Sequence, residues 1–202
     1  IEATTLASAP LIYFHRSRHA MEATWKYVVL CSVGIALALL GTVFLGLAAD
    51  RNGHPSLSFD SMVSTAAGLD PALVRTAFVF LIVGYGTKMG LAPLHAWLPD
   101  AHSEAPSPVS ALLSGASLNL AFLAILRVLP ICEAAGEGAF ARQLLIMFGL
   151  ISLLFAAVFV LRQPDFKRLL AYSSVEHMGF AALGVGLGGA AVGGALLHVI
   201  GH

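Results

Sequence analysis

The chain has 202 residues, of which 58% are hydrophobic and 11% are charged, and its 11 basic and 11 acidic residues give a formal net charge of zero. Soluble domains carry about 25% charged residues, so this composition predicts an integral membrane protein. Zero net charge, and no basic stripe with interleaved aromatic residues, exclude nucleic acid as a partner.

Apolar runs near the length of a membrane-crossing helix recur along the chain. About 20 apolar residues cross a bilayer as a helix, and such runs differ from the alternating ten-residue strands of a membrane barrel. The sequence therefore predicts an all-α, polytopic transmembrane helix bundle. The complete spans predicted are residues 25–49, 73–97, 108–130, 143–161 and 169–187. With a partial span at each end, we expect residues 1–202 to form a single transmembrane domain, truncated at both ends.

Basic residues between the spans predict the orientation. Six fall on one side and three on the other, and the side richer in Lys and Arg faces the cytoplasm. The first group is Arg16, Arg18, Lys26, Arg162, Lys167 and Arg168, and the second is Arg51, Arg75 and Arg142. We expect a multi-pass protein in a bacterial or archaeal plasma membrane.

Lys88 lies inside the apolar run 73–97, where an ammonium group costs at least about 2.5–3.5 kcal/mol on insertion scales. A snorkelling lysine is the alternative, but Lys88 is far from both ends of its run. Pro93 cannot donate a backbone hydrogen bond, so the helix is predicted to break just beyond Lys88. A buried lysine can be set near neutrality by desolvation and a carboxylate, which is what a proton carrier requires.

Glu2 is an acid of the type that would partner Lys88, and the alternative is a helix-end carboxylate that faces water. His198 and His202 are four residues apart and share a helix face, which suits a proton relay. Metal binding and structural hydrogen bonding are the alternatives. Glu176 and His177 fit either a relay or a polar helix entrance.

The remaining ionisable residues of the connections and the two cysteines indicate no specific function. The polar connection after residue 94 contains His95, Asp100, His102 and Glu104, which could equally be a solvated loop. Cys31 and Cys132 lack C-x-x-C spacing and are interpreted as packing residues. The sequence has no dinucleotide fingerprint, P-loop or cysteine cluster, so we expect no metal and no cofactor in this chain.

Two long motifs carry a family resemblance. Residues 86–113, GTKMGLAPLHAWLPDAHSEAPSPVSALL, and residues 165–179, DFKRLLAYSSVEHMG, resemble the antiporter-like membrane subunits of respiratory complex I, Mrp-type cation/proton antiporters and membrane-bound hydrogenases. Two short sequences, EATT at residues 2–5 and SSVEHMG at residues 173–179, are most similar to the F-type component of hydrogenase-4 complexes.

This resemblance implies an inverted-repeat fold with broken helices, of which the chain would hold the end of the first repeat and the start of the second. It implies that Glu2, Lys88, His198 and His202 are the proton-transfer residues, in the positions of the family's essential glutamate, lysine and relay histidines. The chain departs from the family where a histidine or lysine is usual, because Ser114 and Asn119 stand at the nearest positions and neither titrates.

The resulting hypothesis is a redox-silent, proton-translocating membrane subunit of a hydrogenase-4-like or NADH-quinone oxidoreductase-like complex, with Glu2 setting the proton affinity of Lys88. Its partners would be other membrane-arm subunits, redox subunits reached through them, the lipid bilayer, and protons or sodium ions. The alternatives are an Mrp-type cation/proton antiporter subunit and a purely structural membrane anchor.

Overall fold

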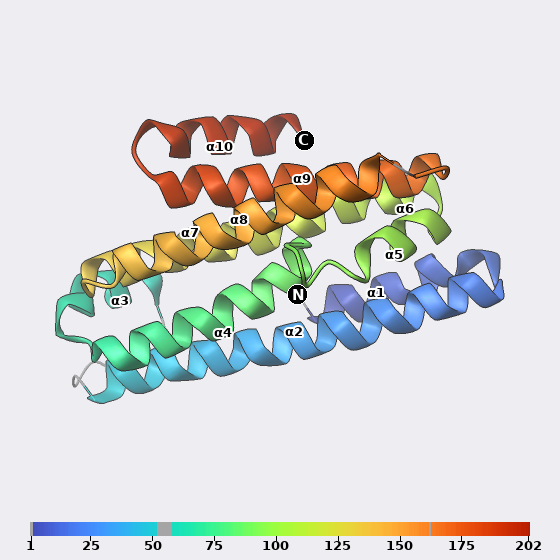
Figure 1. Ribbon diagram of the computed structural model, residues 1–202. Coiled ribbons are helices and arrows are strands. Elements are labelled where there is room, and N and C mark those ends of the chain that lie inside the picture. The colour runs from blue at the N-terminus through green and yellow to red at the C-terminus, as the bar shows by residue number, and fades with distance from the viewer. Residues whose placement is uncertain (1, 52–57, 162) are drawn as a thin grey trace.

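A computed structural model describes residues 2–51, 58–161 and 163–202, which form long helices lying side by side (Figure 1). The first part contains α1 (Glu2–Ile12), η1 (Tyr13–His15), α2 (Arg18–Arg51), α3 (Phe59–Thr65), η2 (Ala66–Gly68), α4 (Pro71–Met89) and α5 (Leu98–Glu104). The second contains α6 (Ser107–Leu112), the π-helical segment η3 (Leu113–Leu118), α7 (Asn119–Ala134), α8 (Gly138–Val160), α9 (Phe166–Leu187) and α10 (Ala190–Gly201). The predicted all-α transmembrane bundle is confirmed.

Four helical segments in the described part of the chain are long and apolar enough to cross a membrane. They are α2, α4, α8 and the continuous run α6–η3–α7, Ser107–Ala134. The predicted span 169–187 lies on α9, a helix of 22 residues that is not among these four. The predicted span 73–97 is shorter than expected, because α4 ends at Met89.

The break in the helix that carries Lys88 is present, and it begins earlier than Pro93. Helix α4 ends at Met89 and is capped by Gly90, whose φ of 79° is a left-handed conformation that favours glycine. Pro93 lies further along, in the non-helical segment 90–97 that joins α4 to α5. Lys88 is therefore in the last turn of α4, next to the interruption.

Aspartate side chains cap the N-termini of two helices, α4 and α9. Asp70 precedes α4 and accepts a hydrogen bond of 2.9 Å from the backbone N–H of Ala72. Asp165 precedes α9 and accepts one of 2.8 Å from the backbone N–H of Lys167. Each carboxylate satisfies an N–H that has no partner inside its helix, so both helix starts are specified by the local sequence.

Glycines allow the helices to pack closely. A Cβ on Gly84 of α4 would lie 2.5 Å from the backbone nitrogen of Ala38 and the carbonyl oxygen of Gly34, both on α2. A Cβ on Gly149 of α8 would lie 2.9 Å from the carbonyl oxygen of Gly179 on α9. The α2–α4 and α8–α9 pairs thus approach backbone to backbone, as small residues permit in membrane bundles.

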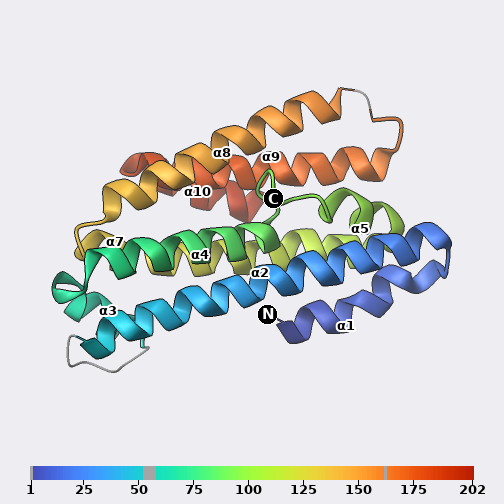
Figure 2. The same cartoon turned by 60° about the horizontal axis from the view of Figure 1, so that its bottom comes forward.

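The two groups of basic residues lie at opposite ends of the bundle, as their pattern predicts. Helix α5 and the starts of α2 and α9 share one end, and α3 with the starts of α4 and α8 share the other (Figure 2). Lys26 and Arg168 even bind the same carboxylate, that of Asp100. Arg162, which belongs to the first group, lies outside the described residues.

Candidate functional site

Lys88 is buried in the bundle, with 1% of its surface exposed. Its Nζ donates hydrogen bonds to Thr5 Oγ1 on α1, at 3.0 Å, and to Tyr27 OH on α2, at 2.8 Å. The ammonium also lies 4.6 Å from the Tyr27 ring centroid and 5.7 Å from the Trp97 ring centroid. Aromatic faces attract a cation, so hydroxyls and rings replace the water that Lys88 lacks.

The hydrogen-bonded chain continues beyond Tyr27. Its hydroxyl lies 2.6 Å from Ser8 Oγ on α1. Ser8 in turn donates to the carbonyl oxygen of Thr4, at 2.8 Å. Hydroxyl groups both donate and accept, so Tyr27 and Ser8 extend the hydrogen-bonded chain from Lys88 to the Thr4 carbonyl oxygen.

Two side chains stabilise the interruption after α4. Trp97 Nε1 donates to the Thr87 carbonyl oxygen at 2.8 Å, which satisfies an acceptor near the helix end. Ser152 Oγ on α8 accepts a hydrogen bond of 2.9 Å from the backbone N–H of Ala92. Non-helical backbone at membrane depth requires such partners, and here the protein interior supplies them.

Glu2 lies near this site without pairing with Lys88. Its Oε1 accepts a hydrogen bond of 2.6 Å from Ser32 Oγ on α2, and its Oε2 is buried without a partner. Ser32 follows Tyr27 by five positions, which is about 7.5 Å along a helix. Within the described ranges no ion pair joins Glu2 and Lys88. The acid is thus held by Ser32 on α2, the helix that also carries Tyr27.

A second cluster unites the predicted histidines. His177 Nδ1 on α9 lies 2.8 Å from His198 Nε2 on α10, and the His177 and His202 rings are 4.7 Å apart. His202 Nε2 lies 3.0 Å from Ser114 Oγ in η3, which is also 3.0 Å from Ser174 Oγ. The π-helical segment therefore reaches the histidines through Ser114.

The histidine cluster borders a cavity of about 440 Å³. Its polar lining residues are His102, Ser107, Ser110, Ser114, Lys167, Ser173, Ser174, His177 and His202. His102 lies in α5. Burial lowers its pKa to about 4, and the charges of Lys167 and His202 lower the pKa further in the same direction. A cavity with this many hydroxyl and imidazole groups is large and polar enough to hold several water molecules.

The other predicted residues are less closely joined to these clusters. Glu176 is half-buried, and in the part of the chain that the structure describes its side chain makes no hydrogen bond or ion pair. Asn119 donates to the Gly115 carbonyl oxygen and does not reach the histidines. His95 and His102 are buried, so the solvated-loop alternative is wrong for both.

Among the described residues, no three His, Cys, Asp or Glu side chains are arranged to hold a metal ion. Cys31 and Cys132 are both free and buried, which agrees with their interpretation as packing residues.

Sequence reasoning missed Tyr27, Thr5 and Ser8, although one signal was available. Tyr27 lies inside an apolar span, and a buried tyrosine hydroxyl usually finds a hydrogen-bond partner. That rule would have marked Tyr27 as a polar contact, without identifying Lys88 as its partner.

Comparison with known proteins places these clusters in a family. All of residues 1–202 match the family model described as NADH:quinone oxidoreductase/Mrp antiporter, transmembrane. The chain belongs to this family. The NADH:quinone oxidoreductase/Mrp antiporter family is the one that the two motifs resemble, so the resemblance is confirmed.

Relatives within the NADH:quinone oxidoreductase/Mrp antiporter family carry several names. The chain is 46% identical over 206 residues to the hydrogenase-4 component F homolog of Methylacidiphilum infernorum (isolate V4), an alignment that covers 100% of the chain and 43% of the relative. It is 35% identical over 204 residues to NADH-quinone oxidoreductase subunit N of Desulforudis audaxviator (strain MP104C), covering 100% of the chain and 40% of the relative. The chain thus spans less than half the length of these relatives.

A solved structure confirms the fold. A chain in the structure of the membrane-bound sulfane sulfur reductase, an archaeal respiratory membrane complex, superposes with a TM-score of 0.86 at 28% identity. The superposition covers 98% of this chain and 40% of that chain. The arrangement of the helices is therefore that of a chain in a solved respiratory membrane complex.

Proposed function

We propose that this chain is part of a redox-silent, proton-translocating membrane subunit of a multi-subunit oxidoreductase of the hydrogenase-4 or NADH-quinone oxidoreductase type. The names of the relatives support this class. In this proposal the chain holds no electron-carrying cofactor, and its partners are other membrane subunits and, through them, the redox subunits. Its membrane is the plasma membrane of a bacterium or archaeon.

The observation that carries the proposal is the burial of Lys88 against neutral hydroxyls. A fully buried ammonium is costly unless a carboxylate pairs with it, and Lys88 Nζ donates hydrogen bonds to the neutral hydroxyls of Thr5 and Tyr27. A packing role is met at lower cost by Leu or Met. The charge is retained where a helix is interrupted, which suits a group that binds and releases a proton.

The histidine cluster supplies the second half of the route. His177, His198 and His202 are in contact, and each imidazole can receive a proton on one nitrogen and release one from the other. Ser114 extends this cluster into η3, toward the helices that hold Lys88. The polar cavity gives the histidines access to water. In this proposal both clusters carry protons on side chains of this chain.

The test is Lys88→Met in the full-length chain within its assembled complex. Proton uptake and electron transfer are measured together in inverted membrane vesicles. We expect proton uptake to fall at least about tenfold, because a positioned proton-transfer group contributes about 10²–10⁴-fold. Met89→Leu is the matched control, since Met89 is the neighbouring buried residue and carries no proton. Wild-type uptake in Lys88→Met would reject the proposal.

The same vesicles separate this function from the two alternatives. A secondary antiporter exchanges sodium for protons when only a pH gradient is imposed, whereas the proposed subunit requires electron transfer. A structural anchor tolerates Lys88→Met, Glu2→Leu and His202→Leu together without loss of proton uptake. Sodium-dependent exchange in the absence of an electron donor would replace the proposal with the antiporter function.

A further inference from the structure

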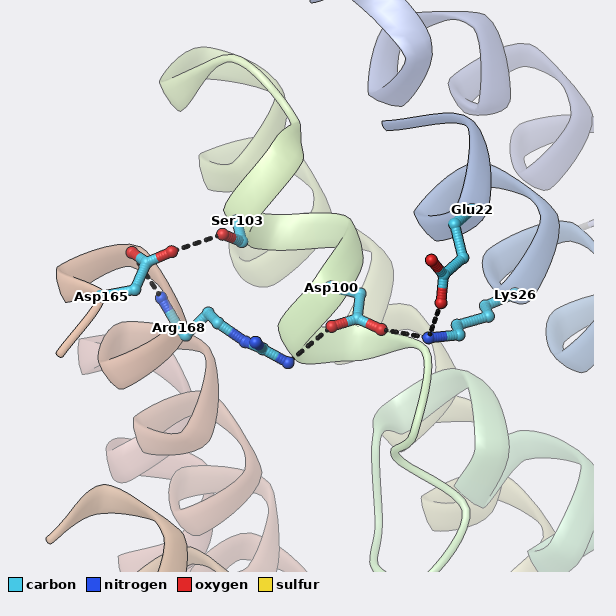
Figure 3. Close-up of polar contacts among 6 residues, drawn as sticks. All are labelled: Glu22, Lys26, Asp100, Ser103, Asp165 and Arg168. Atoms are coloured by element: carbon cyan, nitrogen blue, oxygen red, sulfur yellow. Dashed lines mark hydrogen bonds and ion pairs between the residues drawn. The ribbon is translucent and has the colours of Figure 1, made fainter. Parts of the chain in front are cut away.

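Asp100 in the short helix α5 is bound from two sides. Its Oδ2 accepts a hydrogen bond of 2.9 Å from Lys26 Nζ on α2, and its Oδ1 accepts one of 2.7 Å from Arg168 on α9 (Figure 3). Lys26 is also paired with Glu22, at 2.7 Å. One carboxylate thus connects a helix of the first part of the chain with a helix of the second.

Further contacts fix the same helix to α9. Ser103 Oγ donates to Asp165 Oδ2 at 2.6 Å, and this bond lowers the pKa of Asp165, which keeps the carboxylate ionised (Figure 3). Lys167 Nζ donates to the carbonyl oxygens of Ser103 and Ala105, at the end of α5. Helix α5 has seven residues, too few to be stable alone, so these side chains decide where it lies.

The position of α5 reaches Lys88 through Trp97. Trp97 immediately precedes α5 and has no exposed surface. Its Nε1 donates to the Thr87 carbonyl oxygen, and its ring lies 5.7 Å from Lys88 Nζ. Because a close-packed interior transmits small displacements, a shift of α5 moves Trp97 and changes the surroundings of Lys88.

We infer that Asp100 is a positioning residue that couples α9, the helix of His177, to the site of Lys88 by binding Lys26 and Arg168 at once. This inference rests on the proposed function and adds the way its two clusters influence each other. The two ion pairs are partly exposed to solvent, so each of them can break and re-form while the other contacts of α5 persist. A cavity of about 270 Å³ beside them, lined by His19, Glu22, Lys26, Asp100, Ser103, Glu104 and Arg168, gives room for that exchange.

Asp100→Asn tests this coupling, because it removes the charge and keeps the shape. We expect proton uptake in the assembled complex to fall at least about threefold while electron transfer and the amount of complex stay at wild-type levels, since residues along a coupling network alter coupling severalfold. Glu133→Gln is the matched control. It breaks the Glu133–Arg142 ion pair between α7 and α8, at the opposite end of the bundle from α5 (Figure 1).

Further variants separate positioning from stability. Asp100→Glu restores both ion pairs in the proposed role and should recover proton uptake. Arg168→Gln by itself should reduce proton uptake as Asp100→Asn does. The double variant Asp100→Asn, Arg168→Gln should show no further reduction, because both changes remove the same interaction. Should Asp100→Asn fail to assemble, Arg168→Gln and Lys26→Gln carry the test, and wild-type uptake in both overturns the inference.

Failure of the inference and failure of the proposed function give different results. If Lys88→Met abolishes proton uptake but Asp100→Asn behaves like Glu133→Gln, Lys88 acts as proposed and Asp100 does not couple the clusters. If Lys88→Met itself retains wild-type uptake, the proposed function is wrong, and a defect in Asp100→Asn no longer supports coupling.

Discussion

Tyr27 and Lys88 are joined by a hydrogen bond of 2.8 Å in the interior of the bundle, and the same tyrosine hydroxyl lies 2.6 Å from Ser8. The aromatic ring and the hydroxyl of Tyr27 therefore serve Lys88 in different ways. The ring lies 4.6 Å from Nζ and stabilises a cation, whereas the hydroxyl connects Lys88 to a further proton acceptor.

Tyr27→Phe separates these two contributions, because phenylalanine keeps the ring and lacks the hydroxyl. We expect slower proton uptake in the assembled complex, by about tenfold, since losing a partner of a buried charge costs about 1.5–3 kcal/mol. Tyr13→Phe is the control, because Tyr13 lies in η1, away from Lys88. Equal uptake in the two variants would show that the Tyr27 hydroxyl has no part in the route.

Ser114→Ala tests the link between η3 and the histidine cluster. Ser114 Oγ contacts both His202 and Ser174 at 3.0 Å, and alanine removes both hydrogen bonds. A neutral hydrogen bond contributes about 1 kcal/mol, so we expect the loss of the bond to His202 to slow proton uptake by about fivefold. Ser64→Ala is the control, because Ser64 is exposed on α3 and contacts neither cluster. A Ser114→Ala complex that works at the rate of Ser64→Ala would exclude Ser114 from the relay.

Local patterns predicted most of the fold. Apolar length predicted α2, α4, α8 and the run α6–η3–α7, because a helix that crosses a bilayer must be apolar along its own sequence. The buried position of Lys88 and the interruption after it followed from the same reasoning. The exact end of α4 did not follow from this reasoning. Gly90 can end a helix as well as Pro93 can, and Gly90 precedes Pro93 in the chain.

The candidate site depended more on contacts between distant residues. Lys88 meets Thr5, which is 83 residues away, and Tyr27, which is 61 residues away, so no local pattern could identify these partners. Glu2 is expected to act on Lys88, and this stays a prediction; its hydrogen-bond partner Ser32, 30 residues away, could not be identified from the sequence. The spacing of His198 and His202 predicted that they share a helix face. Their contact with His177 could not be predicted, because it depends on how α9 and α10 pack together.

Ser152→Ala tests how the helix interruption is held. Ser152 Oγ accepts the hydrogen bond from the buried backbone N–H of Ala92, and alanine leaves that donor without a partner. An unsatisfied buried donor costs about 1–3 kcal/mol, so we expect a lower midpoint of thermal unfolding for the purified full-length chain. Ser64→Ala is the control, because Ser64 is exposed on α3 and surface changes usually stay within about 0.5 kcal/mol. Equal midpoints would mean that Ala92 finds another partner.

His102 makes stability depend on pH in a defined window. Burial lowers its pKa from 6.5 to about 4, so the folded chain holds this imidazole neutral while the unfolded chain protonates it. Stability is then full above pH 6.5 and falls as the pH drops toward about 4, by at most about 1.4 kcal/mol per pH unit. In His102→Gln the unfolding midpoint should decline less steeply across this window than in the exposed-site control His15→Gln. If the unfolding midpoints of the two variants fall equally with pH, His102 is not the source of the pH dependence.

Gly84→Ala tests the backbone contact between α2 and α4. The added Cβ would lie 2.5 Å from the Ala38 nitrogen and the Gly34 oxygen, so the two helices must move apart. Overpacking costs about 1–3 kcal/mol, which exceeds the gain of about 0.5–1 kcal/mol from replacing a helical glycine by alanine. Gly193→Ala is the control, because nothing lies within 4 Å of a Cβ at that position of α10. We expect a lower unfolding midpoint for Gly84→Ala and an unchanged or higher one for Gly193→Ala. Since α4 carries Lys88, Gly84→Ala should also reduce proton uptake, and a variant with wild-type stability and uptake would show that the helix contact is not as tight as described.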